Sequence, residues 1–216
     1  MRRTKEQAQQ TRRNIMAAAL RTFNRRGIAH TTMEDIAAAA KVTRGAIYWH
    51  FAGKRALLRA IRDDVSLPLV DRADFTLLDD REGEPLERVE RFLTDLVDAI
   101  ESDKRTRQAL CVMSFKCEYV GELEGELKEY GRKNERLRRT LAEVYSDARK
   151  RGQLRAELSP DLAALETTVF LAGLLRLSLM ESGCTLVREQ ARQLIAVHVA
   201  GRRPVLREAG GGRRKV

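Results

Sequence analysis

The stretch from Thr32 to Phe51 reads TMEDIAAAAKVTRGAIYWHF, and it decides the fold of the amino-terminal part of the chain. Thr32 is followed three positions later by Asp35, a spacing that favours a helix start related to the capping box. A tight turn at residues 41–42 separates this helix from a second short one, which Thr43 can cap. Two short helices joined in this way form a helix-turn-helix, whose second helix can enter the major groove of DNA. An ordinary helical hairpin in a bundle is the alternative interpretation.

The side chains of the second short helix suit contacts with DNA. The Arg44 guanidinium can donate a bidentate pair of hydrogen bonds to guanine O6 and N7. Such a pair contributes about 1–3 kcal/mol of discrimination against a wrong base. Gly45 costs about 1 kcal/mol in a helix relative to alanine, so it indicates a close approach to a partner. Thr43 and Tyr48 can contact a phosphate or a thymine methyl group. For Tyr48 and Trp49, packing between helices is the alternative. The predicted DNA-binding residues are Thr32, Thr43, Arg44, Gly45, Tyr48, Trp49, His50 and Lys54.

The charge distribution supports the same interpretation. The 216-residue chain has a formal net charge of +10, but residues 1–62 hold fourteen Lys or Arg and only three Asp or Glu. Residues 63–201 hold 21 basic and 27 acidic residues, so the body of the chain is mildly acidic. A basic amino-terminal part joined to an acidic body is what we expect of a protein that binds a polyanion, such as a nucleic acid, at one end. His50 and Lys54 are candidate phosphate contacts, and Lys54 lies near the start of the next helix, where anions bind readily.

Helical periodicity runs through nearly the whole chain, and no segment alternates with the period of two that is typical of strands. Besides the two short helices, we expect helices over about residues 6–26, 54–65, 86–100, 122–151, 160–182 and 186–200. Ser159 should cap the helix that starts at residue 160, with Pro160 in its first turn. Residues 109–119 form a further apolar stretch, residues 68–85 should be irregular, and residues 201–216 should be disordered. The predicted organisation is a DNA-binding domain over residues 1–65, a helical ligand-binding and dimerisation domain over 66–201, and a disordered basic tail over 202–216.

Other classes of protein are disfavoured. The amino terminus lacks the apolar core of a signal peptide, and the longest apolar run, residues 167–175, is too short to span a bilayer. Three cysteines without paired spacing argue against a disulfide scaffold or a zinc site, and simple packing is favoured over a thiol sensor. Three histidines, no phosphate loop and no nucleophile elbow argue against an enzyme. We therefore expect a cytoplasmic protein with no cofactor, no metal and no membrane partner.

Three segments resemble the DNA-binding domain of TetR/AcrR-type repressors. They are TRRNIMAAALRTFNRRG, TTMEDIAAAAKVTRGAIYWHF and GKRALLRAI, at residues 11–27, 31–51 and 53–61. The segment VTRGAIYWHF at residues 42–51 is especially similar to the same segment in repressors that control multidrug efflux pumps. FKCEYVGEL at 115–123 resembles a segment on a middle helix of those repressors. The specific match covers about the first 60 residues. The resemblance implies an all-helical, two-domain subunit that forms a homodimer and leaves DNA when a small hydrophobic or cationic molecule binds the larger domain.

The larger domain is where such an effector would bind, because a regulator needs a second site whose occupancy biases its DNA-binding heads. Apolar and aromatic residues of its helices are candidates for the lining, with ordinary core packing as the alternative for each. In the related efflux repressors a histidine precedes the Lys-Cys-Glu triplet, where this chain has Phe115, and some relatives carry an aspartate where it has Ala172. The predicted ligand-binding residues are Phe92, Leu96, Cys111, Phe115, Tyr119, Val144, Tyr145, Val169 and Phe170.

The last two predicted helices carry more apolar residues than one small bundle needs, so they are the expected dimer surface. The residues concerned include Leu171, Leu174, Leu175, Leu177, Leu179 and Met180. A two-fold dimer would place its recognition helices roughly 34–36 Å apart on a palindromic DNA operator. The predicted function is a transcriptional repressor, released by its effector, of a multidrug efflux pump operon. The alternatives are an effector-independent DNA-binding protein and a regulator of an unrelated metabolic operon.

Overall fold

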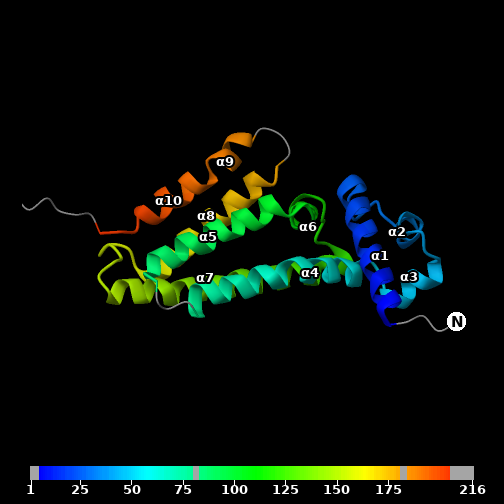
Figure 1. Cartoon of the computed structure of the whole chain (residues 1–216), viewed down its shortest axis with the longest axis horizontal. Helices are drawn as coiled ribbons and strands as arrows, with labels where there is room; N and C mark the ends of the chain where they lie inside the picture. The colour runs from blue at the N-terminus through cyan, green and yellow to red at the C-terminus, as the bar shows by residue number, and fades with distance from the viewer. Residues whose placement is uncertain (1–4, 80–82, 181–183, 205–216) are drawn as a thin grey trace, which may run out of the picture.

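The chain forms an elongated molecule built from helices, in a computed structural model that describes residues 5–79, 83–180 and 184–204 (Figure 1). The described residues contain no β-strand, which confirms the predicted all-α fold class. One end is the head, which consists of α1 (Lys5–Arg26), α2 (Met33–Ala40) and α3 (Arg44–His50). The long helix α4 (Lys54–Asp74) leaves the head along the long axis of the molecule. The body consists of α5 (Pro85–Ser102), α6 (Lys104–Phe115), α7 (Glu124–Lys150), α8 (Pro160–Ser178), α9 (Thr185–Glu189) and α10 (Ala191–Ala200).

The first helix forms as its sequence predicts. Ile15, Ala19 and Phe23 are buried and recur at the spacing of one helix face, which packs against α2. Gly27 has a left-handed φ of 78°, and its N–H donates to the carbonyl of Phe23 at 2.8 Å. A glycine in this conformation is the usual residue after a helix end, because it has no Cβ to clash. The chain can therefore turn sharply from α1 into the helix-turn-helix.

Helix α4 is longer than predicted, and the expected irregular stretch from residue 68 is wrong in its first part. The helix continues past Pro68 to Asp74 and is followed by a π-helical turn, η1 (Phe75–Asp79). A proline inside a helix removes one backbone hydrogen bond and usually bends or ends it. Here α4 packs against α1, α5 and α6, and tertiary packing overrides the local preference. Leu77 in η1 is fully buried, and the buried Arg88 of α5 donates to its carbonyl at 3.2 Å.

The remaining differences from the predicted helices lie at helix ends. Helix α6 ends at Phe115, so the apolar stretch 109–119 is helical only in its first part, and a short 3₁₀ turn, η2 (Gly121–Leu123), precedes α7. Helix α8 starts as predicted, with Ser159 as its cap and proline in the first turn, but it ends at Ser178 rather than at 182. The helix expected over 186–200 is two helices that meet at Gln190.

The carboxyl-terminal boundary also differs from the prediction. Arg202 falls in the segment expected to be disordered, yet it is buried and its Nη2 lies 3.3 Å from Glu166 of α8. The backbone N–H of Arg155 donates to the Arg202 carbonyl at 2.9 Å, which fastens this end of the chain to the loop between α7 and α8. The rest of the predicted basic tail, residues 205–216, lies outside the described residues.

Two hydrophobic clusters organise the described part of the chain. The body cluster is built from α5, α7, α8 and α10, with fully buried residues such as Leu93, Leu141 and Ile195. The head cluster is built from α1 to α4, but it also takes in Ala109 and Val112 of α6 and Leu123 of η2, so the head core continues into the body. No helix in the described ranges is both long and apolar enough to cross a membrane.

Candidate DNA-binding site

The turn between α2 and α3 is fixed by backbone hydrogen bonds. Lys41 takes the left-handed conformation with φ 57°, and its N–H donates to the carbonyl of Ala38 at 3.1 Å. The N–H of Val42 donates to the carbonyl of Ala37 at 3.0 Å. This pair of bonds closes α2 in the manner of a Schellman motif, although a lysine stands where glycine is usual. The tight turn predicted at residues 41–42 is present, and it fixes the angle at which α3 leaves α2.

The two threonine caps define where the short helices begin. The Thr32 hydroxyl accepts from the N–H of Asp35 at 3.0 Å, and the Thr32 N–H donates to the Asp35 carboxylate at 3.0 Å, which makes a complete capping box. Hydrogen bonds to the Asp35 carboxylate lower the pKa of Asp35. The bond from the Thr32 N–H has the largest effect, and the bond from the Thr32 hydroxyl has the next largest. The Thr43 hydroxyl accepts from the N–H of Ala46 at 3.2 Å and caps α3. Because both hydroxyls serve as caps, the two threonines fix where α2 and α3 begin, in addition to lying at the edge of the site.

Helix α3 separates an inward face from an outward face. Ile47 and Phe51 are buried in the head cluster, while Arg44, Tyr48 and Trp49 point outward. The Arg44 side chain is 75% exposed, and Trp49 is 73% exposed, so the alternative in which Trp49 packs between helices does not hold in this chain. The Arg44 guanidinium lies 5.8 Å from the centre of the Tyr48 ring, as expected for residues four apart on one face. These outward side chains form a compact polar and aromatic surface.

Gly45, His50 and Lys54 complete the predicted set. A Cβ on Gly45 would meet no atom within 4 Å, so the outer surface of α3 is open at this position. His50 is half-buried, and its ring packs edge-on against Trp49 with centres 4.5 Å apart. Lys54 is the first residue of α4, and its Nζ donates to the carbonyl of Ile28 at 3.3 Å. All eight predicted residues thus lie within the helix-turn-helix or at the start of α4.

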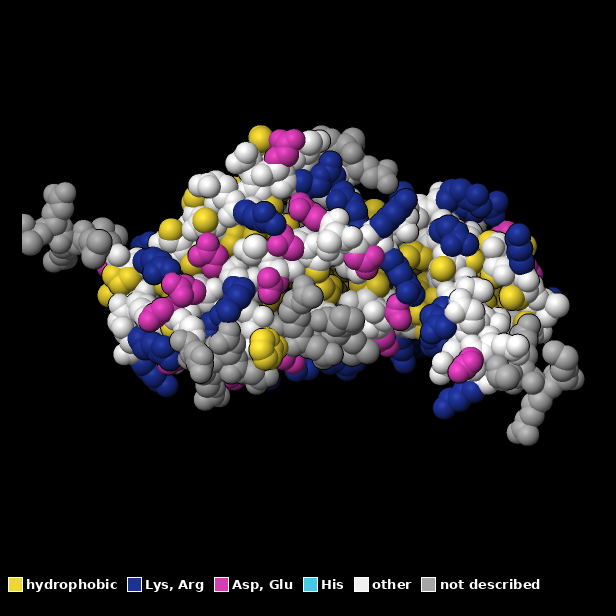
Figure 2. Space-filling model, viewed as in Figure 1, with side chains coloured by type: hydrophobic (Ala, Val, Ile, Leu, Met, Phe, Trp, Pro, Cys, Tyr) yellow, Lys and Arg dark blue, Asp and Glu magenta, His cyan; other side chains and the backbone are white. Residues whose placement is uncertain are grey.

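The surface charge of the head differs from that of the body. Figure 2 shows dark blue basic side chains outnumbering acidic ones over the head, whereas both signs alternate over the body. A small hollow beside α3 is lined by Ala8, Ala46, Trp49 and His50, so the start of α1 borders the same surface. The sequence prediction missed this contribution of α1, although the basic residues near the amino terminus point to it.

The predicted ligand-binding residues fall into two groups. Phe92, Val144 and Tyr145 are buried in the body cluster, and Leu96 and Phe170 pack against it. The other four lie elsewhere. Val169 is 64% exposed on the outside of α8, and Cys111 is half-buried in α6. Phe115 lies under the Arg176 guanidinium at the end of α6, and the Tyr119 hydroxyl donates to the carbonyl of Met113.

Three polar side chains form a hydrogen-bonded row among the predicted ligand-binding residues that belong to the body cluster. The Tyr145 hydroxyl lies 2.7 Å from the Thr167 hydroxyl, which in turn lies 3.0 Å from Nε2 of His198. The His198 ring stacks on Phe170 with centres 4.0 Å apart. Burial is the main cause that lowers the pKa of His198, and the positive charge of Arg202 lowers it further, to about 4. The imidazole is therefore neutral at pH 7 and available as a hydrogen-bonding group beside aromatic rings.

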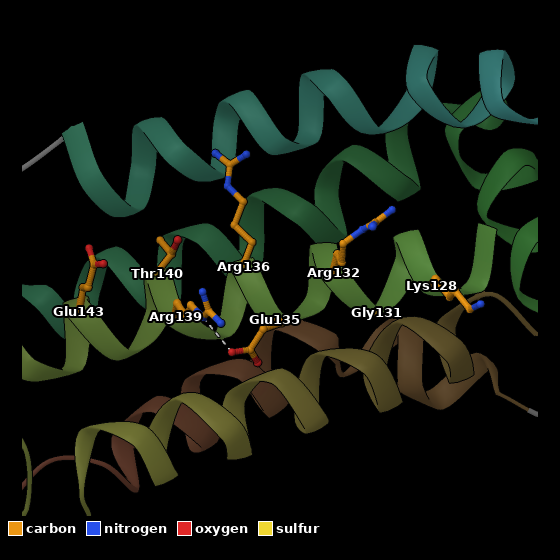
Figure 3. Close-up of a pocket in the computed structure, with 8 residues that line it drawn as sticks. All are labelled: Lys128, Gly131, Arg132, Glu135, Arg136, Arg139, Thr140 and Glu143. Atoms are coloured by element: carbon orange, nitrogen blue, oxygen red, sulfur yellow. Dashed lines mark hydrogen bonds and ion pairs between the residues drawn. The ribbon is translucent and has the colours of Figure 1, made fainter. Parts of the chain in front are cut away.

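A charged hollow lies along α7 (Figure 3). Its lining includes Lys128, Arg132, Glu135, Arg136 and Arg139, and the Glu135 carboxylate accepts from Arg139 at 2.8 Å. Arg136 points toward α4 and binds Asp74 there. The polar character of this hollow differs from the apolar, aromatic site that the sequence predicts. The buried aromatic group around Tyr145 matches that expectation better.

The head is joined to the body by an ionic cluster that sequence reasoning did not find. Arg55, Arg59 and Arg62 follow one another along one face of α4, and all three bind the carboxylate of Glu126 on α7. Glu126 is only 4% exposed. Burial alone would raise its pKa, but the hydrogen bonds of the arginines and their charges outweigh burial and lower it. The spacing of the three arginines was visible in the sequence, whereas their partner was not.

Comparison with known proteins identifies the class of protein. Residues 15–61 match the model of bacterial regulatory proteins of the tetR family, and residues 84–200 match the C-terminal region of MAATS-type transcriptional repressors. The chain therefore belongs to the TetR family of transcriptional repressors, as its sequence resemblance predicted.

Individual relatives show which members of the TetR family the chain resembles. The chain is 36% identical over 178 residues to the transcriptional regulator TtgR of Pseudomonas putida, covering 82% of this chain and 83% of the relative. It is 29% identical over 202 residues to AcrR of Shigella flexneri, covering 91% of both. Among solved structures, NalD, the secondary repressor of the MexAB-OprM multidrug efflux pump in Pseudomonas aeruginosa, matches with a TM-score of 0.81 and 26% identity over 92% of this chain and 98% of that one. The chain is thus a transcriptional repressor related to efflux pump regulators, and it is not an enzyme.

Proposed function

We propose that this chain acts as a homodimeric repressor of a multidrug efflux operon, binds a palindromic operator through α3, and leaves DNA when a small hydrophobic or cationic effector binds the body. In this proposal residues 1–65 are the DNA-binding unit and residues 66–201 the effector and dimer unit, within the cytoplasm. The observation that carries it is the outward surface of α3, where Arg44 and Tyr48 stand exposed on a helix fixed by caps on both sides of a tight turn. The predicted roles of Thr32, Thr43, Arg44, Gly45, Tyr48, Trp49, His50 and Lys54 belong to this proposal.

The apolar outer surface of α8 to α10 supports the homodimer. Large apolar side chains are exposed there, and patches of this kind mark association surfaces in soluble proteins. They are Leu162, Leu165, Val169, Leu177, Met180, Leu186, Leu194 and Val197. Of the six residues named for dimerisation from sequence, Leu177 and Met180 lie on this surface. Leu171, Leu174 and Leu179 are buried in the subunit and Leu175 is partly buried, so those four serve its own core.

The buried aromatic group in the body supports an effector site. Phe92, Tyr145 and Phe170 supply apolar surface, while Thr167 and His198 supply hydrogen-bonding groups beside them. Ligand sites commonly combine a mostly apolar lining with a few placed polar groups. The solved complex of SmeT with triclosan, which matches this chain with a TM-score of 0.76 and 26% identity over 89% of this chain and 91% of that one, suggests an aromatic probe.

The test uses the full chain and a DNA duplex that it selects from a random pool. We expect a palindromic sequence, a complex containing two subunits or a multiple of two, and release of the DNA when triclosan is added. Tyr145→Leu should weaken the response to triclosan while leaving DNA binding intact. Selective binding that is unaffected by triclosan and by a panel of hydrophobic cations would instead favour an effector-independent DNA-binding protein.

A further inference from the structure

An acidic side chain, Glu34, lies beside the outward surface of α3 and pairs with one of its residues. Residues 1–62 contain only Glu6, Glu34 and Asp35 as acids. Asp35 is occupied by the capping box and by Arg26, which lies 3.1 Å away. Glu34, on the first turn of α2, is 51% exposed and lies next to α3. A carboxylate on a surface that approaches phosphates opposes binding, so its presence there needs a physical reason.

The partner of Glu34 is the arginine that we assign to base reading. Oε1 of Glu34 lies 3.2 Å from Nε of Arg44, and the ring of Tyr48 lies 5.8 Å from the carbon of the guanidinium. A salt bridge therefore places a carboxylate at the inner nitrogen of the guanidinium, and the Tyr48 ring flanks the same group. Its two terminal nitrogens form the fork that matches guanine O6 and N7. Because Arg44 is 75% exposed, this fork faces solvent rather than the protein interior.

We propose that Glu34 is a positioning residue that sets sequence specificity, an inference that rests on the proposed function of α3. By binding Nε, the carboxylate holds the terminal fork in the orientation that reads a base, which reduces the freedom that Arg44 loses on binding. By partly neutralising Arg44, it also weakens the attraction of that side chain to any phosphate. The second effect penalises DNA of every sequence, whereas the first compensates only where a guanine is in place.

A purely structural role predicts something different. An acid in the first turn of a helix stabilises that helix through its dipole, whichever residue lies nearby. Replacing such an acid changes the unfolding temperature of the protein but leaves the ratio of specific to non-specific DNA affinity unchanged. The ratio is therefore the quantity to measure.

The experiment compares two duplexes by fluorescence anisotropy at a fixed salt concentration. One is the duplex that the wild-type chain selects from a random pool, and the other is a scrambled duplex of the same composition. We expect Glu34→Ala to bind the scrambled duplex more tightly and to lower the affinity ratio about tenfold, within the range that one bidentate arginine–guanine pair contributes. Glu34→Gln retains an acceptor oxygen and should restore part of the ratio.

Two further variants separate this role from a general charge effect. Glu87→Gln removes an exposed charge from the first turn of α5 in the body, away from α3, and should leave the ratio within about twofold of wild type. In the Arg44→Ala background, Glu34→Ala should no longer change the ratio, because its effect acts through Arg44. An unchanged ratio in Glu34→Ala, or an equal loss in both backgrounds, would overturn the proposal. If the wild-type chain selects no sequence at all, the proposed function of α3 fails, which is a distinguishable result.

Discussion

Thr32 illustrates how one side chain positions the predicted DNA-binding surface. Its hydroxyl and N–H both bind Asp35, so they satisfy backbone groups that would otherwise be left open at the start of α2. Asp35 is itself bound by Arg26 of α1, so the start of α2 is also fixed to α1. The orientation of α2, and through the turn that of α3, thus depends on a few short contacts around one threonine.

Thr32→Ala should lower the free energy of unfolding by about 1 kcal/mol, the usual cost of losing a helix cap. Equilibrium urea unfolding measures this difference. Thr94→Ala is a matched control, because the Thr94 hydroxyl donates to the carbonyl of Glu90 in its own helix rather than capping a helix start. Alanine favours a helix interior, so the control should be neutral or stabilising. Equal losses in the two variants would mean that the capping box contributes nothing.

His198 makes the stability of the body sensitive to pH. Its pKa is lowered to about 4 in the folded chain, from an ordinary value of 6.5. The unfolded chain therefore takes up a proton at a higher pH than the folded chain, and the folded state loses stability as pH falls from about 6.5 toward 4. Above this range the residue is neutral in both states and has no such effect.

His198→Gln should make the stability of the protein less dependent on pH in that range. Urea unfolding of the wild type and the variant at pH 7 and pH 5 gives the comparison, with the amide as a replacement hydrogen-bonding group for Thr167. The wild type should lose more stability than the variant between the two values. Identical losses would show that the ring of His198 takes up protons equally in the folded and unfolded chain.

At the scale of helices, local sequence signals predicted helix starts better than helix ends. The capping residues Thr32, Thr43 and Ser159 marked helix starts correctly, because a cap acts on backbone groups two or three residues away. The continuation of α4 past Pro68 could not be predicted, since it depends on packing against helices distant in sequence. For the same reason the sequence did not pair Glu126 with the arginines of α4.

The same limit applies to the candidate sites. The eight predicted DNA-binding residues are close in sequence, so one motif places all of them within the helix-turn-helix or at the start of α4. The predicted ligand-binding residues come from helices that only the folded body brings together. Phe92 and Tyr145 meet in the body cluster, whereas helical periodicity alone could not reveal that Val169 faces outward on α8.

Glu126→Gln should weaken the junction between α4 and α7. The neutral amide removes the one negative charge that all three guanidinium groups share, and we expect a loss of about 1–3 kcal/mol in the free energy of unfolding. Because the pKa of Glu126 is lowered, its contribution is present above its ordinary value of 4.5 and is lost as pH falls through the lowered pKa. The difference between wild type and variant in urea unfolding should therefore shrink on acidification. A constant difference would contradict this account.

Gly125 provides a second test of the same junction. A Cβ at this position would lie 2.7 Å from Nη2 of Arg55, so alanine would force that guanidinium to move. Gly131, on the same helix, has no atom within 4 Å of its Cβ position. Gly131→Ala should stabilise the protein by up to about 1 kcal/mol through helix propensity, and Gly125→Ala should gain less or lose stability. Equal gains would mean that Arg55 is not held at Glu126.

For the whole molecule, charge and apolar surface are arranged at different places. The basic head lies at one end, and the exposed apolar side chains of α8 to α10 lie on the body (Figures 1 and 2). In a two-fold dimer joined through the body, the two heads would be held at a set separation, which is what a palindromic site requires. The continuity of the head core with α6 and the Glu126 cluster would transmit changes in the body to the heads.

Val197→Asp should disrupt the dimer, because this exposed side chain of α10 would place a charge in an apolar interface. We expect sedimentation velocity to show a dimer for the wild type and a monomer for the variant, with weaker binding of the variant to a selected palindrome. Leu127→Asp changes an exposed apolar residue of α7, which is not one of the three helices that form this surface, and serves as the control. A Val197→Asp variant that remains dimeric would exclude the outer surface of α10 as the interface.

The most direct measurement for the central claim is selection from a random DNA pool followed by sequencing, with the wild-type chain and with Arg44→Ala. We expect the wild type to enrich a palindromic motif with a fixed guanine in each half. The variant should remain folded and lose the preference for that guanine. If the variant enriches the same motif with the same strength, α3 does not read DNA through Arg44.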